Sequence, residues 1–235
     1  MMSRATPTPP PTGSTAVVIG ARGGIGAALV DALRAQGHYA TVVPLSRPAI
    51  DLTNEASIAT AARTLPEGEL RLVLDATGFL HDTDQRPERS LRDLDAAALA
   101  RNFALNAIGP ALLMKHFLPL LPREGKAVFA TLSARVGSIG DNRLGGWYGY
   151  RASKAALNQL VRTAAIELAR TRPDAVCVAL HPGTVATSLS APFAKAGLDV
   201  RPPDVAAADL LGVIGTLTAA RTGSFLDWRG ETVPW

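Results

Sequence analysis

The sequence predicts an α/β protein with one domain, built on a doubly wound parallel sheet that carries helices on both faces. Short apolar runs rich in β-branched residues alternate along the chain with longer runs rich in Ala and Leu. Strands separated by helical stretches pair in parallel through right-handed crossovers, which place helices on both faces of the sheet. Hydrophobic residues make up 47% of the 235 residues, which is enough for one sizeable core.

Each predicted element has its own local signal. The strand at 15–19 is a continuous apolar run that ends at a glycine, as a buried parallel strand does. Ile25, Leu29 and Leu33 recur at helical spacing, and Gly37 then supplies a stop. Ser90 and Asp93 have capping-box spacing, which predicts a long helical stretch from there to residue 121. The remaining predicted strands are 41–45, 71–75, 126–132, 176–180 and 224–228, and the other helices are 24–36, 54–64, 149–170 and 205–218.

Composition restricts the location and the partners. The single cysteine, Cys177, cannot form an internal disulfide and suits the reducing cytoplasm. The net charge of +4 includes no basic stripe, so nucleic acid is not an expected partner. No apolar run reaches the roughly 18 residues of a membrane span, and the four scattered histidines predict no metal site. Residues 1–14, with four prolines, predict a disordered leader before a Rossmann-like domain at 15–235.

The turn after the first strand predicts a dinucleotide site. It reads Gly20-Ala-Arg-Gly-Gly24-Ile25-Gly26 and leads directly into a helix. Gly20 permits a sharp turn, Gly24 leaves room for a pyrophosphate, and Gly26 permits close helix packing. The phosphate then meets free N–H groups at the positive end of the helix dipole.

The end of the second strand favours NADPH over NADH. An NAD site usually has an Asp or Glu there, and that charge would repel a 2′-phosphate. Here the strand ends in Ser46 and Arg47, and Arg22 adds a second positive charge from the glycine turn. Arginine pairs with phosphate in a forked geometry. The alternative is that either arginine is simply solvated.

A tyrosine and a lysine form the second constellation. Tyr150 and Lys154 are four residues apart near the start of a predicted helix, so they share one face. An ammonium one turn away is expected to lower the pKa of a phenol and prepare it for acid–base work. Tyr148 would point away from Lys154 and is the weaker candidate.

In their order along the chain, these motifs resemble those of the short-chain dehydrogenase/reductase family, from about Thr15 to the C-terminus. Residues 145–158, His181-Pro182-Gly183-Thr184 and the closing Pro234-Trp235 are similar to the branch of C-factor and sniffer-like carbonyl reductases. The resemblance also rests on Asp51-Leu52, Asp75-Ala76-Thr77-Gly78, Asn106, the segment 133–137 and Thr187.

The resemblance implies a role for each matching residue. Tyr150 would be the general acid in carbonyl reduction, Lys154 would hold the nicotinamide ribose, and Asn106 would anchor a water of the proton relay. The implied catalytic set is therefore Tyr150, Lys154, Asn106 and Ser133. The implied cofactor contacts are Gly20, Arg22, Gly24, Ile25, Gly26, Ser46, Arg47, Asp51, Leu52, Ala76, Thr77, Gly78, Asn106, Tyr150, Lys154, Pro182, Gly183, Val185 and Thr187.

Three departures from the family pattern affect these expectations. Aligned on Gly137, the usual catalytic serine is Ala134, so Ser133, Ser138 or neither polarises the carbonyl. Asp75 replaces an asparagine, which is expected to alter a structural hydrogen bond. Only three residues separate Arg47 from Asp51, so a helix that relatives have there is missing and the adenine side is more open.

Two functions remain open on the sequence. The first is an NADPH-dependent reductase of small or medium aldehydes or ketones, or the reverse alcohol oxidation. The second is a non-catalytic NADPH-binding sensor, which Ala134 and the C-factor likeness favour.

A homo-oligomer, dimer or tetramer, is expected by resemblance through the helices at 91–121 and 149–170. Trp147, Trp228 and Trp235 suit a substrate pocket or a subunit contact equally, and residues 82–95 suit a solvated loop or a mobile flap.

Overall fold

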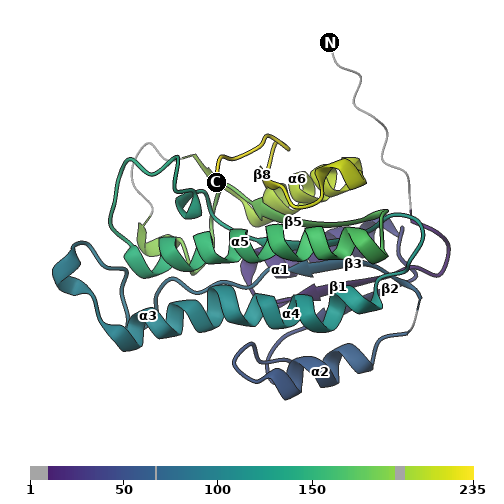
Figure 1. The fold of residues 1–235 in the computed structure, drawn as a ribbon, viewed down its shortest axis with the longest axis horizontal. Helices are drawn as coiled ribbons and strands as arrows, with labels where there is room; N and C mark the ends of the chain where they lie inside the picture. The colour runs from purple at the N-terminus through teal and green to yellow at the C-terminus, as the bar shows by residue number, and fades with distance from the viewer. Residues whose placement is uncertain (1–9, 67, 194–198) are drawn as a thin grey trace, which may run out of the picture.

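A six-stranded, all-parallel sheet forms the centre of the protein in the computed structural model, which describes residues 10–66, 68–193 and 199–235 (Figure 1). The strand order is β2-β1-β3-β4-β5-β8. The strands are β1 (Thr15–Ile19), β2 (Thr41–Leu45), β3 (Leu70–Asp75), β4 (Ala127–Leu132), β5 (Ala175–His181) and β8 (Phe225–Asp227). The order reverses beside β1, and ligands of such sheets bind at the carboxyl ends of the strands near that point. The predicted fold class is confirmed.

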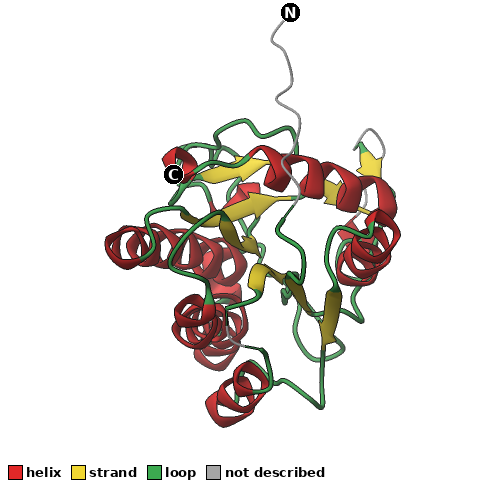
Figure 2. Cartoon of the chain, turned by 90° about the vertical axis from the view of Figure 1, so that its right-hand side faces the viewer, coloured by secondary structure: helices red, strands yellow, loops and turns green. Residues whose placement is uncertain are grey.

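Helices cover both faces of this sheet (Figure 2). The helices α1 (Gly24–Gln36) and α6 (Pro203–Thr216) pack together on one face. The other face carries α2 (Glu55–Arg63), α3 (Ala96–Phe103), α4 (Gly109–Phe117) and α5 (Tyr148–Thr171). Gly37 ends α1 in the left-handed conformation, with φ of 65°, as its position after the last apolar repeat predicts.

Each strand contributes alternate residues to two separate cores. Val17 and Ile19 of β1 pack with α2, α4 and α5, whereas Ala16 and Val18 pack with α1 and α6. A strand that is buried on both faces needs apolar residues at every position, which explains the uninterrupted run at 15–19. Lys126, just before β4, donates hydrogen bonds to the carbonyls of Ile214 (3.0 Å) and Gly215 (2.7 Å) and so caps the end of α6.

The long helical stretch differs from the prediction in detail. The capping box at Ser90 and Asp93 is present, but it closes only a 3-10 turn at Leu91–Asp93. A new helix then begins at Ala96, with Asp95 as its N-cap. A π-helical turn, Ala104–Ile108, separates α3 from α4, because the Gly109 N–H donates to the carbonyl of Ala104. The capping box therefore lies at the end of a loop, and α3 begins about one turn after it.

Two further features differ from what the sequence predicts. A two-stranded parallel ribbon, β6 (Thr184–Val185) with β7 (Val200–Arg201), has no counterpart in it, since two-residue strands leave no periodic signal. Of the expected leader 1–14, residues 1–9 lie outside the described residues. Ser14 is buried, donates to the carbonyl of Pro11 (2.6 Å) and accepts from the N–H of Ala40 (2.9 Å). The folded body therefore includes the residues just before Thr15.

One helical stretch, Ala96–Leu120, is long and apolar enough to meet the criteria for a membrane span by length and composition. Helices in the core of soluble proteins meet the same criteria. This stretch packs against α2 and α5 and contributes Leu113, Met114 and Phe117 to the core. Burial inside the domain therefore accounts for part of its apolar character.

Candidate active site

The glycine turn brings the start of α1 under the carboxyl ends of β1 and β3. Gly20 has φ of 80°, and a side chain there would lie 3.0 Å from the carbonyl oxygen of Ala76. A side chain at Gly26 would collide with the Gly20 carbonyl, so Gly26 lets the first turn of α1 pack closely against the end of β1, as the sequence predicts. No side chain caps α1. The N–H groups of its first turn are therefore available to an anion.

A cavity of about 580 Å³ opens beside this turn. The predicted adenosine contacts line it together: the turn after β1, the end of β2, the loop at 50–52 and the turn after β3. No helix lies between Arg47 and Asp51, as the short spacing predicts. The lining residues include Gly20, Arg22, Ser46, Arg47, Asp51, Leu52, Ala76, Thr77 and Gly78.

Two arginines and a serine stand together at one end of this cavity. The backbone N–H of Arg22 donates to the Ser46 hydroxyl oxygen at 3.1 Å, and the Arg22 guanidinium donates to the carbonyl of Arg47 at 3.2 Å. These contacts fix the glycine turn against the end of β2 and place both side chains at an exposed rim. In the adjoining loop, Thr53 holds the Asp51 carboxylate through its N–H (2.9 Å) and hydroxyl (2.7 Å), and these hydrogen bonds lower the pKa of Asp51.

Lys154 lies next to Gly78, one of the residues that line the cavity. A side chain at Gly78 would come within 3.9 Å of the Lys154 amine, and that amine donates to the carbonyl of Leu132 at 2.8 Å. Burial lowers the pKa of Lys154 to about 8, and the buried Asp75 carboxylate opposes that shift. Asp75 itself accepts from Thr77 and from the Thr131 hydroxyl (2.7 Å), so it ties β3 to β4, the structural role expected of it.

Tyr150 and Lys154 share one face of α5, as their spacing predicts. The Lys154 amine is 6.0 Å from the centre of the Tyr150 ring, and both side chains are buried. Burial raises the pKa of the Tyr150 phenol to about 12. Burial is the cause of this shift, and it is opposite in direction to the lowering of the pKa that the sequence predicts from the neighbouring ammonium.

Asn106 is completely buried in the π-helical turn, and both the oxygen and the nitrogen of its side-chain amide are hydrogen-bonded. It accepts from the N–H of Phe79 (2.8 Å) and donates to the carbonyl of Phe79 (2.8 Å) and to the Ser153 hydroxyl (3.1 Å). Ser153 in turn donates to the carbonyl of Tyr150 at 2.9 Å. Asn106 thus joins the loop after β3 to the first turn of α5.

The candidate serines are placed differently. The buried Ser133 hydroxyl donates to the Asn158 side-chain oxygen at 2.7 Å. Asn158 is eight residues beyond Tyr150, which is about 12 Å along a helix axis. The Ser133 hydroxyl hydrogen is therefore directed toward Asn158, away from the first turn of α5. Ser138 is buried, and the neighbouring Gly137 packs against the Lys154 backbone of α5. The Ser138 hydroxyl oxygen accepts from the N–H of Asp141 (3.1 Å).

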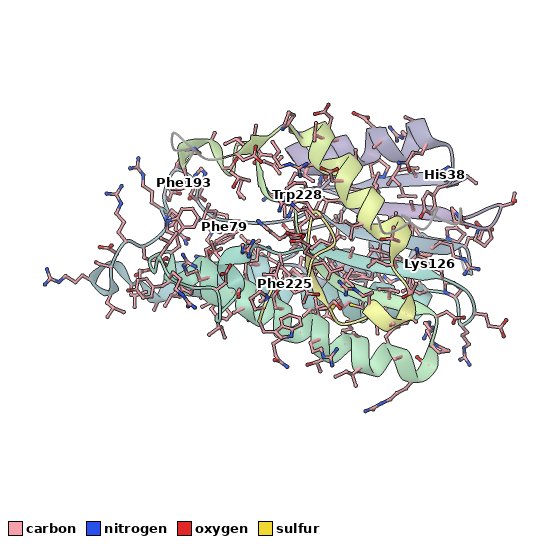
Figure 3. All side chains as sticks on the ribbon, turned by 90° about the horizontal axis from the view of Figure 1, so that it is seen from above. His38, Phe79, Lys126, Phe193, Phe225 and Trp228 are labelled. Atoms are coloured by element: carbon pink, nitrogen blue, oxygen red, sulfur yellow. The ribbon has the colours of Figure 1, made fainter. Side chains whose placement is uncertain are left out.

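The described part of the loop after β6 is linked to Tyr150 through Trp147. Phe193 packs edge-on against Trp147 (5.0 Å between ring centres) and His81 (5.2 Å), and Trp147 packs edge-on against Tyr150 (6.2 Å). A side chain at Gly24 would lie 2.8 Å from the Thr187 methyl, so this loop also reaches the glycine turn. Phe79 and Phe193 lie at one end of the molecule in Figure 3, and Lys126, at the start of β4, lies at the other. The carboxyl ends of the strands thus carry the site.

The stem of this loop rests on Trp228. Gly183 has φ of 81°, and a side chain there would contact the Trp228 ring (3.2 Å) and Arg201 (3.3 Å). The Arg201 guanidinium lies 3.7 Å from the centre of the Trp228 ring and pairs with Asp209. Pro182, Gly183 and Val185 are thereby held near the site, although they do not line the large cavity. Trp147 lies at the site, whereas Trp235 stacks on Phe225 and is half exposed.

Sequence reasoning missed several residues of this region. Asn102, Ser153 and Asn158 form its buried polar contacts, and Glu88 reaches the start of α5 from the charged segment 82–95. Asn102 lies one helical turn before Asn106, which is a signal that could have been used. Among the described residues, no three His, Cys, Asp or Glu side chains are grouped as a metal site would need.

Taken together, the doubly wound sheet, its phosphate-binding turn and the buried phenol beside an ammonium define an NAD(P)-dependent oxidoreductase. The sequence comparisons identify its family. A family model described as "Enoyl-(Acyl carrier protein) reductase" matches residues 28–200. The chain belongs to the short-chain dehydrogenase/reductase family, as its motifs indicate.

Similar proteins are known in bacteria and animals. The chain is 32% identical to 1-hydroxy-2-glutathionyl-2-methyl-3-butene dehydrogenase of Rhodococcus over 94% of its own length and all of that protein. It is 40% identical to C-signal of Myxococcus xanthus over 62% of its length and 84% of that protein. The NADPH-bound carbonyl reductase from chicken fatty liver superposes with a TM-score of 0.80 at 26% identity, covering 94% of each chain.

Proposed function

We propose that this chain reduces the carbonyl group of small or medium aldehydes or ketones with NADPH, and runs the reverse oxidation of the alcohol. The observation that carries the proposal is the cavity at the carboxyl edge of the sheet. Arg22 and Arg47 line it, and Lys154, which shares a face of α5 with Tyr150, lies next to its lining residue Gly78. The two guanidinium groups would bind the 2′-phosphate of a dinucleotide, and the reactive ring of that dinucleotide would lie next to the Tyr150 phenol.

The cavity residues fit this cofactor. The uncapped first turn of α1 would hold the pyrophosphate, Arg22, Ser46 and Arg47 would hold the 2′-phosphate, and Asp51 and Leu52 would border the adenine. When bound, NADPH supplies the hydride for reduction. A short-chain dehydrogenase/reductase of Burkholderia multivorans with bound NADP, 25% identical with a TM-score of 0.76 over 94% of this chain and 99% of that one, supports the choice.

Tyr150 is the proposed proton donor. A phenol is protonated at neutral pH, and burial, which raises the pKa of Tyr150 to about 12, further favours that form, so Tyr150 has a proton to deliver to the carbonyl oxygen. Lys154, fixed by the Leu132 carbonyl, would hold the ribose hydroxyls and stabilise the phenolate that remains.

The backbone carbonyl of Asn106 is the group that would take part in returning a proton to Tyr150. Its side chain is occupied by Phe79 and Ser153, so it is not free for a water molecule. Four residues on, Pro110 has no N–H, and the Asn106 carbonyl therefore lacks the donor that an α-helix would give it. That carbonyl is the proposed acceptor for the relay water.

Ser138 is the proposed second donor to the carbonyl oxygen. Its oxygen accepts from Asp141, which leaves the hydroxyl hydrogen for the substrate, whereas the Ser133 hydrogen is directed to Asn158. The aromatic group of His81, Trp147 and Phe193 would exclude water from the reacting atoms.

Replacing the two serines separately should separate their roles. We expect Ser138→Ala to lower kcat about 10²- to 10³-fold, the usual cost of one lost oxyanion donor. Ser133→Ala should leave kcat nearly unchanged but destabilise the fold by about 1–3 kcal/mol, because Asn158 keeps a buried unpaired acceptor. Steady-state kinetics and denaturant unfolding test both statements, and the opposite pattern would return the catalytic role to Ser133.

A carbonyl panel decides between this function and the alternative. Wild-type protein is incubated with NADPH or NADH and with aliphatic and aromatic aldehydes and ketones, and cofactor absorbance is followed. Consumption of NADPH with at least one carbonyl, well above that of NADH, supports the proposal. The alternative is an NADPH-binding sensor, which Ala134 at the usual serine position favours. Tight NADPH binding without consumption on any carbonyl or alcohol would support the sensor.

We also propose that the enzyme is a cytoplasmic homo-oligomer paired through α4 and α5. A groove of about 430 Å³ lies between these helices and is lined by Ala111, Leu160, Thr163 and Ala164. Ile108 and Ile166 are exposed nearby on the same helical layer. The single cysteine, Cys177, is buried and free, which suits a reducing compartment.

Thr163→Arg tests the pairing. Thr163 is exposed, so the monomer should lose no more than about 0.5 kcal/mol of stability, while a charge placed in a symmetric interface meets its own copy. We expect light scattering to show monomers for this variant and oligomers for wild type and for Ala35→Arg, an exposed control on α1. Oligomers of unchanged size in Thr163→Arg would exclude this interface.

A further inference from the structure

The helix that carries Tyr150 has no N-terminal cap of its own. Its N-cap position is Trp147, which has φ of 54° and no side-chain hydrogen bond to the helix. Gly145 and Gly146 before it are also in the left-handed region, at φ of 63° and 64°. The first N–H groups of a helix need acceptors, and here the preceding residues provide none from their side chains.

Glu88 supplies the missing acceptors from 61 residues upstream. Its carboxylate accepts from the N–H of Gly149 at 3.1 Å, and its backbone carbonyl accepts from the N–H of Trp147 at 2.6 Å. The side chain is only 4% exposed, although it belongs to the charged segment 82–95. Burying a carboxylate is costly unless it is compensated, and the positive end of the α5 dipole provides compensation.

Gly149 makes this approach possible. A side chain at this position would lie 2.8 Å from Glu88 Oε1 and 2.8 Å from the Asn102 amide nitrogen. Among the described residues Glu88 Oε1 has no hydrogen-bond partner, so the carboxylate faces the helix end with one oxygen bonded and one packed against Gly149. Any larger residue directly before Tyr150 would displace Glu88.

The first turn of α5 is thus held from two sides. Glu88 accepts from the N–H of Gly149 in this turn and from the N–H of Trp147 just before it, while Ser153, itself bonded to Asn106, donates to the carbonyl of Tyr150. We propose that Glu88 is a positioning residue for Tyr150: it fixes the first turn of α5 so that the phenol meets the substrate oxygen. This inference rests on the proposed carbonyl reductase function for its kinetic consequence, but not for its structural one.

The test compares Glu88→Ala and Glu88→Gln with wild type and with Glu124→Ala, an exposed glutamate before β4. Glutamine keeps an acceptor for the Gly149 N–H and alanine removes it. We expect kcat to fall about 10- to 100-fold in Glu88→Ala, the scale of a misplaced catalytic group. KM for NADPH should stay within about 2-fold, and glutamine should restore kcat to within about 5-fold of wild type.

Hydrogen exchange provides a readout that needs no turnover. Glu88→Ala should lose amide protection at residues 148–153 and keep it at residues 160–171, and Glu124→Ala should lose none. Gly149→Ala, which displaces the carboxylate sterically, should show the same local loss and the same drop in kcat. Unchanged protection at 148–153 in Glu88→Ala, or lost protection with kcat retained, would overturn the inference. If wild type reduces no carbonyl, the proposed function fails, and the exchange data still decide whether Glu88 caps α5.

Discussion

Tyr150→Phe should reduce carbonyl turnover by about 10²- to 10⁴-fold, the range that a positioned general acid contributes. The hydroxyl is the only part of the side chain removed, and the ring keeps its edge-on contact with Trp147. Lys154 stays bonded to the Leu132 carbonyl, so the affinity for NADPH should change by less than about 3-fold. Steady-state kinetics and a direct binding titration measure the two quantities separately.

Tyr148→Phe is the matched control for this change. Tyr148 is two residues away on the same helix and loses the same atom, but it does not share the face of Lys154. It should retain nearly full activity. A Tyr150→Phe enzyme with most of the wild-type rate, or a Tyr148→Phe enzyme without it, would contradict the assigned proton donor.

The double variant Arg22→Ala/Arg47→Ala should raise KM for NADPH by about 100-fold, since each charged hydrogen bond contributes about 1.5–3 kcal/mol before solvent screening. KM for NADH should change by less than about 3-fold, because NADH has no 2′-phosphate to lose contacts with. The two guanidinium groups stand at the same end of the cavity with Ser46, and no acidic residue ends β2. Kinetics with both cofactors give the comparison.

Arg92→Ala, at an exposed position in the segment 82–95, is the control for removing one positive charge. It should leave both KM values unchanged, because screening at physiological salt limits the reach of a surface charge to about 8 Å. If KM for NADPH and KM for NADH rise equally in the double variant, the arginines contact a part of the molecule that both cofactors share.

The sheet could be predicted because each strand carries its own signal. Strands buried on both faces need unbroken apolar runs, and the run at 15–19 ends at Gly20 in the predicted place. The glycine turn was predictable for the same local reason. The left-handed backbone at Gly20 and Gly37 leaves few other residues possible.

The site was less predictable wherever a side chain acts across a long sequence separation. Ser133 precedes the active-site loop, but its partner is Asn158, 25 residues on, and strand direction alone could not reveal that. Glu88 was placed in a solvated or mobile segment because its neighbours are charged, yet its partner Gly149 is 61 residues away. The side chain of Asn106 likewise bonds to the backbone of Phe79, which lies 27 residues away in another loop.

Hydride transfer itself is tested most directly with NADPH that carries deuterium at the transferring position of the nicotinamide ring. The protein is mixed with this cofactor and a carbonyl that the panel identifies, and the alcohol is analysed by mass spectrometry and NMR. We predict one deuterium on the carbinol carbon of every product molecule, with the hydroxyl proton coming from solvent through Tyr150. Alcohol without deuterium, or bound NADPH that yields no alcohol at all, would contradict the account.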